Sequence, residues 1–186
     1  MNASPAIRRE LRPGDLGAII AHHGATYLPE YDLDSTFEAH VAASVAEAGK
    51  RGFPRPSEGL WIVESNGRHA GSVAFTDEGD GIATLRWFVL DRELRGRGLG
   101  RRLIGEVIDE ARDAGFEVLQ LETFSDLSAA AHLYRSHGFE LLSADTRPRW
   151  GRPITYHRYE LSFQVRAQSR NSSRAGSSER PFSVSA

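Results

Sequence analysis

The spacing of apolar residues alternates along the chain between a period of two and a period of about 3.6, which is typical of an α/β protein. Apolar residues recur at strand spacing in residues 60–64 and 70–75, and the Asn66-Gly67 pair between them is typical of a β-hairpin turn. In contrast, residues 99–114 carry apolar side chains on one helical face, and Gly115 follows where helices commonly end. The two patterns together exclude an all-helical and an all-β fold.

The remaining elements follow from the same two spacings and from residues that begin or end helices. Asp15 is predicted to cap the first helix, and Ser35 and Glu38 have the spacing of a capping box. Residues 147–152 are rich in arginine and are predicted to form a loop. The predicted order is β-α-α-β-β-β-α-β-α-β-β, with strands at residues 7–11, 60–64, 70–75, 82–90, 118–123, 139–143 and 155–163, and helices that begin near residues 15, 35, 99 and 128.

Composition limits the chemistry. The lack of cysteine excludes disulfides, thiolate metal sites and a cysteine nucleophile. The formal net charge of −2 gives no general attraction to nucleic acid or to anionic membranes. No apolar run approaches the roughly 20 residues that a membrane-spanning helix needs. The histidines lack His-Glu-x-x-His or similar spacing. We therefore expect no nucleic acid, no membrane and no metal.

The two ends of the chain differ from its middle. The first nine residues lack the apolar stretch of a secretory signal, so a cytoplasmic location is expected. Residues 167–186 contain seven serines and only two sizeable apolar side chains, Phe182 and Val184. So few apolar groups cannot offset the entropy lost on ordering. We predict one folded domain over residues 1–166 and a disordered Ser/Arg-rich tail over residues 167–186.

A glycine-rich segment, Arg95-Gly96-Arg97-Gly98-Leu99-Gly100, lies between the strand predicted at residues 82–90 and the helix that follows. Glycines let the backbone approach a ligand closely, and the first amides of a helix lack acceptors within it. The helix dipole and the surrounding arginines favour a polyphosphate. The lysine of a nucleoside-triphosphate loop is absent, and Arg101 replaces the third glycine of a dinucleotide loop. Taken alone, the segment is also compatible with an ordinary tight turn.

The surroundings of this segment resemble the GCN5-related N-acetyltransferase (GNAT) family. The acyl-CoA loop of that family reads Arg/Gln-x-x-Gly-x-Gly/Ala, which Arg95, Gly98 and Gly100 match. In register with it, residues 133–139 resemble the family's Leu-Tyr-x-x-x-Gly-Phe motif. The resemblance covers about residues 60–161 and implies a central mixed, mostly antiparallel sheet flanked by helices. Residues 8–47 are similar to acetyltransferase domains fused to MarR-type regulators, through His23-Gly24, Tyr27, Glu30-Tyr31 and Phe37-Glu38.

The resemblance implies that acetyl-CoA is the co-substrate. The backbone of the strand at residues 82–90 would pair with the pantetheine arm, and the amides of the glycine-rich segment would hold the pyrophosphate. Many relatives carry an asparagine that contacts CoA where this chain has Leu127, and Ser128 is a weak substitute for it. The implied cofactor-binding residues are Phe88, Val89, Leu90, Arg95, Gly96, Arg97, Gly98, Leu99, Gly100, Arg101 and Ser128.

The resemblance also implies which groups take part in catalysis. Tyr134 matches the tyrosine that protonates the departing CoA thiolate, and a backbone amide near Val89 would polarise the thioester carbonyl. Tyr134 also lies on the apolar face of its helix, so a purely structural role is the alternative. Many relatives carry a glutamate as general base where this chain has Thr84. The candidate bases are Glu122, Glu30 and His23, unless the amine loses its proton to water.

The expected activity is transfer of an acetyl group from acetyl-CoA to a primary amine, directly and in a ternary complex. The alternative is a non-catalytic acyl-CoA-binding or regulatory module, because the strand glutamate and the asparagine are missing. The expected partner is a small-molecule or peptide amine, and family members often pair, so a homodimer is compatible with the resemblance. Arg86 is a candidate for binding an acceptor carboxylate, although an exposed strand face explains it equally well. The expected acceptor-binding residues are His23, Tyr27, Glu30, Tyr31 and Arg86.

Overall fold

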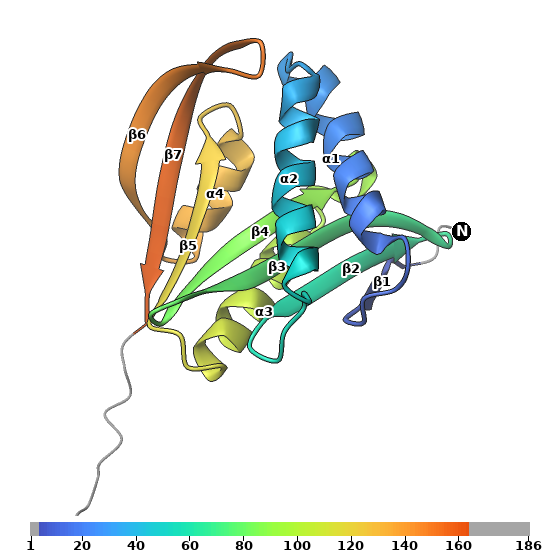
Figure 1. Ribbon diagram of the computed structural model, residues 1–186, viewed down its shortest axis with the longest axis vertical. Coiled ribbons are helices and arrows are strands. Elements are labelled where there is room, and N and C mark those ends of the chain that lie inside the picture. Colours follow the sequence, from blue (N-terminus) through green and yellow to red (C-terminus); the bar gives the residue numbers. More distant parts are fainter. Residues whose placement is uncertain (1–3, 164–186) are drawn as a thin grey trace, which may run out of the picture.

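A computed structural model of the chain describes residues 4–163, and within them seven strands form one sheet (Figure 1). The strand order is β1-β2-β3-β4-β5-β7-β6, in which β4 and β5 are parallel and all other neighbours are antiparallel. The predicted mixed, mostly antiparallel sheet is therefore confirmed. The predicted tail at residues 167–186 lies outside the described residues. The strands are β1 (Ala6–Arg8), β2 (Gly59–Ser65), β3 (Arg68–Gly79), β4 (Ile82–Leu90), β5 (Val118–Phe124), β6 (Glu140–Arg149) and β7 (Arg152–Ser162).

Helices cover both faces of the sheet. Figure 1 shows α1 and α2 side by side across β2, β3 and β4, with α3 beyond them. Side chains alternate along β2, so that Trp61 and Val63 pack with α3 while Leu60 and Ile62 pack with α1 and α2. Within residues 4–163, none of the helices is both long and apolar enough to cross a membrane. The helices are α1 (Asp15–Tyr31), α2 (Ser35–Lys50), α3 (Leu99–Asp113), α4 (Ser128–Ser136) and the short 3₁₀ helix η1 (Arg92–Leu94), which the sequence did not predict.

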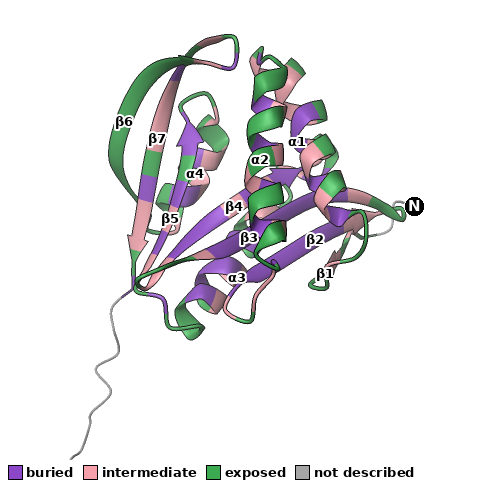
Figure 2. Ribbon diagram, in the orientation of Figure 1, coloured by how far each residue is buried: buried purple, intermediate pink, exposed green. Residues whose placement is uncertain are grey.

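The sheet splits open between β4 and β5. These strands pair only through Ile82, Ala83 and Thr84 on β4, whereas β5 pairs with β7 along its whole length. Figure 2 shows that the strands on the β4 side of the split are largely buried, while β6 at the far edge is exposed. Residues 85–90 of β4 therefore keep one edge free of a strand partner. Backbone groups on such an edge are available to an extended ligand.

A β-bulge in β4 accompanies the split. The register with β3 shifts between Ser72 and Ala74, and Trp87 opposite them has a φ of 48°. The Trp87 carbonyl accepts a hydrogen bond from Ser72 Oγ at 2.8 Å, and its indole Nε1 donates to Ser44 Oγ at 2.9 Å. These bonds hold a conformation that is strained for any residue with a side chain. The bulge thereby re-aims residues 88–90, which border the split.

The helices begin at residues 15 and 35 as predicted, but the two predicted capping residues are wrong by one position. Gly14, with a φ of 94°, occupies the N-cap of α1, while the carboxylate of Asp15 accepts a bond from the Arg12 amide at 2.6 Å. At α2 the predicted capping box does not form, because Asp34 is the N-cap and its carboxylate accepts from the Thr36 amide at 2.9 Å. Aspartate is as good an N-cap as serine, so local preference could not choose between adjacent candidates.

The arginine-rich loop predicted at residues 147–152 is also wrong, because β6 and β7 meet there in a tight hairpin. Trp150 and Gly151 are the two turn residues, with φ of 54° and 85°. Two positive φ values are typical of a type I′ turn, which usually takes asparagine and glycine. Tertiary contacts explain the tryptophan, since its ring packs edge-on against Phe37 at 4.8 Å and its carbonyl accepts from the Asp34 amide at 3.1 Å.

Candidate active site

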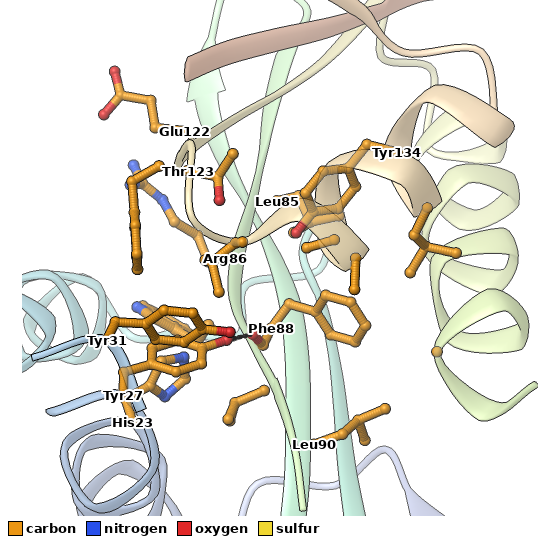
Figure 3. A pocket seen from close by; sticks show the side chains of 18 of the residues that line it. His23, Tyr27, Tyr31, Leu85, Arg86, Phe88, Leu90, Glu122, Thr123 and Tyr134 are labelled. Carbon is orange, nitrogen blue, oxygen red and sulfur yellow. Dashed lines mark hydrogen bonds between the residues drawn. The ribbon is translucent and has the colours of Figure 1, made fainter. Parts of the chain in front are cut away.

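A cavity of about 480 Å³ occupies the split between β4 and β5 (Figure 3). Its volume falls within the range of small-ligand pockets. One half is bordered by the start of α3, by α4 and by the end of β4; the other half is bordered by α1, α2 and the β6–β7 hairpin. Two segments that are far apart in sequence, the glycine-rich turn and the C-terminal part of α1, therefore open onto the same space.

The glycine-rich turn leaves free backbone amides at the start of α3. Gly96 and Gly98 have φ of 72° and 83°, and Gly98 is the N-cap. The first bond of the helix runs from the Arg102 amide to the Gly98 carbonyl at 3.0 Å. The amides of residues 99–101 consequently have no acceptor within the helix, and the positive end of the dipole lies there. This arrangement fits the pyrophosphate of a nucleotide-type cofactor.

Most of the predicted cofactor-binding residues border the cavity. Gly100 lies closest to the opposite wall, because a Cβ built on it would be 3.4 Å from Cζ of Phe88 and 3.6 Å from a methyl group of Leu133. Arg97, Leu99 and Ser128 do not border the cavity. The predicted residues that do border it are Phe88, Val89, Leu90, Arg95, Gly96, Gly98, Gly100 and Arg101.

Two carbonyls on the open edge of β4 already have partners. The Phe88 carbonyl accepts a bond from the Tyr27 hydroxyl at 3.0 Å, and the Leu90 carbonyl accepts from Nε of Arg95 at 2.9 Å. Backbone groups of successive strand residues point to opposite edges, so Phe88 and Leu90 face the split while Val89 faces its β3 partner Ser72. The amides available to a ligand are therefore those that flank Val89. The predicted role of an amide near Val89 stays a prediction.

Tyr134 packs in the core and also borders the cavity, so its position is compatible with both roles that the sequence left open. Its ring packs in the core, 5.8 Å from the ring of Phe139 and 6.1 Å from that of Tyr159. Figure 3 shows its hydroxyl end directed into the cavity, on the side opposite Tyr27 and Tyr31. Burial raises the pKa of this phenol well above its ordinary value. The hydroxyl is therefore protonated at neutral pH, which suits a proton donor.

The three candidate bases lie in different surroundings. Glu122 is exposed at the rim, and Figure 3 shows its carboxylate directed away from Tyr134. Glu30 does not border the cavity and instead accepts a bond from Arg95 Nη1 at 2.8 Å. His23 borders the cavity but is buried, with Nδ1 2.8 Å from the Ile19 carbonyl. The Nδ1 atom therefore carries the hydrogen. The identity of the base stays a prediction.

His23 makes the stability of the fold dependent on pH. Burial, the largest cause, lowers the pKa of His23 from 6.5 to about 4. Between pH 6.5 and pH 4, His23 therefore binds a proton in the unfolded chain but not in the folded chain. The free energy of unfolding consequently falls as the pH drops from 6.5 toward 4. The expected loss is on the order of 3 kcal/mol over this window. Urea unfolding of the wild type and of His23→Gln at several pH values measures it. An identical pH slope in both proteins would contradict this origin.

The half of the cavity that is expected to bind the acceptor is more aromatic than the sequence indicated. The predicted residues His23, Tyr27, Tyr31 and Arg86 border it, although the Arg86 guanidinium is bonded to Glu78 Oε1 at 3.1 Å. Sequence reasoning missed several of the lining aromatic side chains, because no short motif marks them. They include Phe37, His40, Phe124, Trp150 and Tyr156.

His40 stands at this aromatic end beside a fixed cation. Its Nδ1 accepts a bond from Arg149 Nη2 at 3.0 Å, so the hydrogen of the neutral ring is on Nε2. Burial first, and then the charge of Arg149, lowers the pKa of His40. The ring is therefore neutral at physiological pH and presents a donor.

Comparisons with known proteins agree with this geometry. A model of the acetyltransferase (GNAT) family matches residues 20–139. An L-amino acid N-acyltransferase of Escherichia coli, MnaT, is 33% identical over 138 residues, which is 70% of this chain and 77% of that protein. An uncharacterized N-acetyltransferase of Schizosaccharomyces pombe is 30% identical over 142 residues, 73% of this chain and 83% of that protein. Neither the family model nor these two relatives is described as fused to a MarR-type regulator. The predicted similarity to such fused domains therefore stays a prediction.

Solved structures share the fold at lower identity. An acetyltransferase of the GNAT family from Streptococcus pneumoniae superposes with a TM-score of 0.64 at 23% identity, covering 86% of this chain and all of that one. The yncA protein of Salmonella typhimurium, solved with acetyl-CoA, has a TM-score of 0.64 at 22% identity and covers 89% of this chain and 97% of that one.

Proposed function

Because this chain belongs to the acetyltransferase (GNAT) family, we propose that it transfers an acetyl group from acetyl-CoA to a primary amine directly, within a ternary complex. The observation that carries the proposal is a single cavity that joins the free amides at the start of α3, the open edge of β4 and the Tyr134 hydroxyl. A bound thioester and an amine in the aromatic half would share this cavity.

Groups of this chain account for cofactor binding, for the transfer of the acetyl group and for the protonation of the departing thiolate. The amides of residues 99–101 hold the pyrophosphate, and an open-edge amide of Phe88 or Leu90 stabilises negative charge on the thioester oxygen. The amine nitrogen bonds to the carbonyl carbon, the carbon–sulfur bond breaks, and Tyr134 gives its proton to the sulfur. The proton of the amine leaves to water or to a base. Tyr134 then recovers a proton from solvent.

A direct transfer is favoured because, among the described residues, no cysteine borders the cavity and the one serine that does is not activated. The chain has no cysteine. Ser44, which borders the cavity, donates to the Val41 carbonyl at 2.8 Å and accepts from the Trp87 indole at 2.9 Å. A serine committed in this way has no base to activate it. An acetyl-enzyme intermediate is therefore not expected.

We expect CoA release to require both acetyl-CoA and an amine, because no residue of the protein is expected to accept the acetyl group covalently. A thiol reagent would report only released CoA, since the protein contributes no thiol. The assay tests a panel of candidate amines. It begins with L-amino acids, because the Escherichia coli relative is named an L-amino acid N-acyltransferase. Intact mass after incubation with acetyl-CoA alone should be unchanged. A stable gain of one acetyl group would contradict direct transfer, and acetyl-CoA binding without turnover of any amine would favour the non-catalytic module.

A further inference from the structure

Glu30 has a negatively charged side chain at the C-terminal end of α1, where the helix dipole disfavours negative charge. It lies in the last turn of α1, which contains no basic residue, and its side chain is only 16% exposed. The C-terminal end of a helix carries partial negative charge, and burial disfavours an ionised carboxyl group. Contacts outside the helix must therefore stabilise this charge.

Those contacts lead from α1 to the glycine-rich turn. Arg95 Nη1 donates to Glu30 Oε1 at 2.8 Å, the Tyr31 hydroxyl donates to the same oxygen at 3.2 Å, and Arg92 Nε lies 3.5 Å from the other oxygen. Burial acts to raise the pKa of Glu30, but the hydrogen bond and charge of Arg95 outweigh it and hold the pKa below its ordinary value. The carboxylate is ionised at neutral pH.

The same arginine reaches the open edge of β4. While Nη1 binds Glu30, its Nε donates to the Leu90 carbonyl at 2.9 Å. Tyr27 lies on α1, as Glu30 does. Its hydroxyl donates to the carbonyl of Phe88, two residues before Leu90, at 3.0 Å, a bond that Figure 3 marks. Both carbonyls on the open edge are thus held from α1, one directly and one through Arg95.

We propose that Glu30 is a positioning residue that acts through Arg95 to fix the β4 edge on which the thioester lies. The proposal rests on the proposed function and goes beyond it, because it gives Arg95 a different role from the pyrophosphate contact expected from the sequence. Since α1 also carries His23, Tyr27 and Tyr31 into the acceptor half, one helix then sets the geometry of both substrates.

The two roles of Arg95 predict different effects of removing the Glu30 charge. If Arg95 bound pyrophosphate, Glu30→Gln would release a cation toward the phosphates and tighten acetyl-CoA binding. If Glu30 positions Arg95, the β4 edge loosens, and we expect kcat to fall about tenfold with acetyl-CoA bound no more tightly. Arg95→Ala should have the same effect, and the double variant should be no worse than Arg95→Ala alone, because the residues act as one unit.

The experiment measures kcat, the acetyl-CoA dissociation constant by calorimetry at two salt concentrations, and the melting temperature. Asp109→Asn is the matched control, because it breaks an ion pair of similar length, 2.9 Å to Arg112, on the exposed side of α3. Unchanged salt dependence of binding in Arg95→Ala supports positioning, whereas a reduced dependence supports phosphate contact and overturns it.

Three further outcomes overturn the proposal. They are tighter binding by Glu30→Gln, additive losses in the double variant, and a lowered melting temperature with unchanged kcat, which would show a structural role only. The wild-type protein distinguishes failure of the positioning role from failure of the proposed function. If it binds and turns over acetyl-CoA while the variants match it, only the positioning role fails; if it binds no acetyl-CoA, the proposed function fails with it.

Discussion

Replacing Gly100 with leucine is expected to weaken acetyl-CoA binding by about 100-fold or more, whereas the same replacement at Gly105 should leave it unchanged. At position 100 a Cβ would stand 3.4 Å from Phe88, 3.6 Å from Leu133 and 3.7 Å from Leu90, which is ordinary contact distance. The rest of the leucine side chain must then enter the cavity between β4 and α4. A ligand arm and this side chain cannot occupy that space together, because neither can be compressed.

Gly105 is a matched control within the same helix. A Cβ at this position has no atom within 4 Å, and Gly105 does not border the cavity. Both glycines are helical with negative φ, so leucine should favour the helix at either site by about 1 kcal/mol. Calorimetric titration with acetyl-CoA measures the difference. Binding by Gly100→Leu within threefold of the wild type would remove this cavity from the cofactor site.

Replacing Tyr134 with phenylalanine is expected to lower kcat by about 100-fold while leaving acetyl-CoA affinity nearly unchanged. The variant keeps the ring that packs against Phe139 and loses only the hydroxyl that opens onto the cavity. A general acid contributes in the transition state, when the thiolate departs, and hardly at all to ground-state binding. Steady-state rates with the best amine of the panel, together with calorimetry, separate these two effects.

Tyr159 provides the control for this substitution. Its ring lies 6.1 Å from that of Tyr134 in the same core cluster, but it does not border the cavity, and its buried hydroxyl has no partner among the described residues. Tyr159→Phe removes an unsatisfied polar atom, so stability should hold or rise and kcat should not change. Equal turnover in Tyr134→Phe and Tyr159→Phe would leave Tyr134 with a structural role only.

Much of the fold was predictable because its signals are local. The Asn66-Gly67 turn connects β2 and β3 as expected, and β4 spans the predicted residues 82–90. The glycine-rich turn begins α3 with the free amides that its composition indicates. In each case the backbone conformation depends on residues within one turn, and the chain carries those residues in the required order.

The glycine-rich half of the site was predictable from short motifs, and the other half only in part. Gly98, Gly100 and Tyr134 belong to short motifs, and all three border the cavity. His23, Tyr27 and Tyr31 of the aromatic half were predicted and border the cavity. The other aromatic side chains were not predicted, because a buried phenylalanine or tryptophan has the same spacing whether it fills a core or lines a cavity. Trp150 shows this most clearly, since it occupies a turn position that local preference assigns to a smaller residue.

The sequence by itself determined where most strands and helices lie and where the glycine-rich turn leaves its amides free, because those properties depend on neighbours along the chain. Only the tertiary structure decided where β4 and β5 part and which side chains meet in the gap. Tyr27 reaches the Phe88 carbonyl across 61 positions of sequence, and Arg95 reaches Glu30 across 65. Such contacts depend on how packed layers bring distant segments together, and no local pattern encodes that distance.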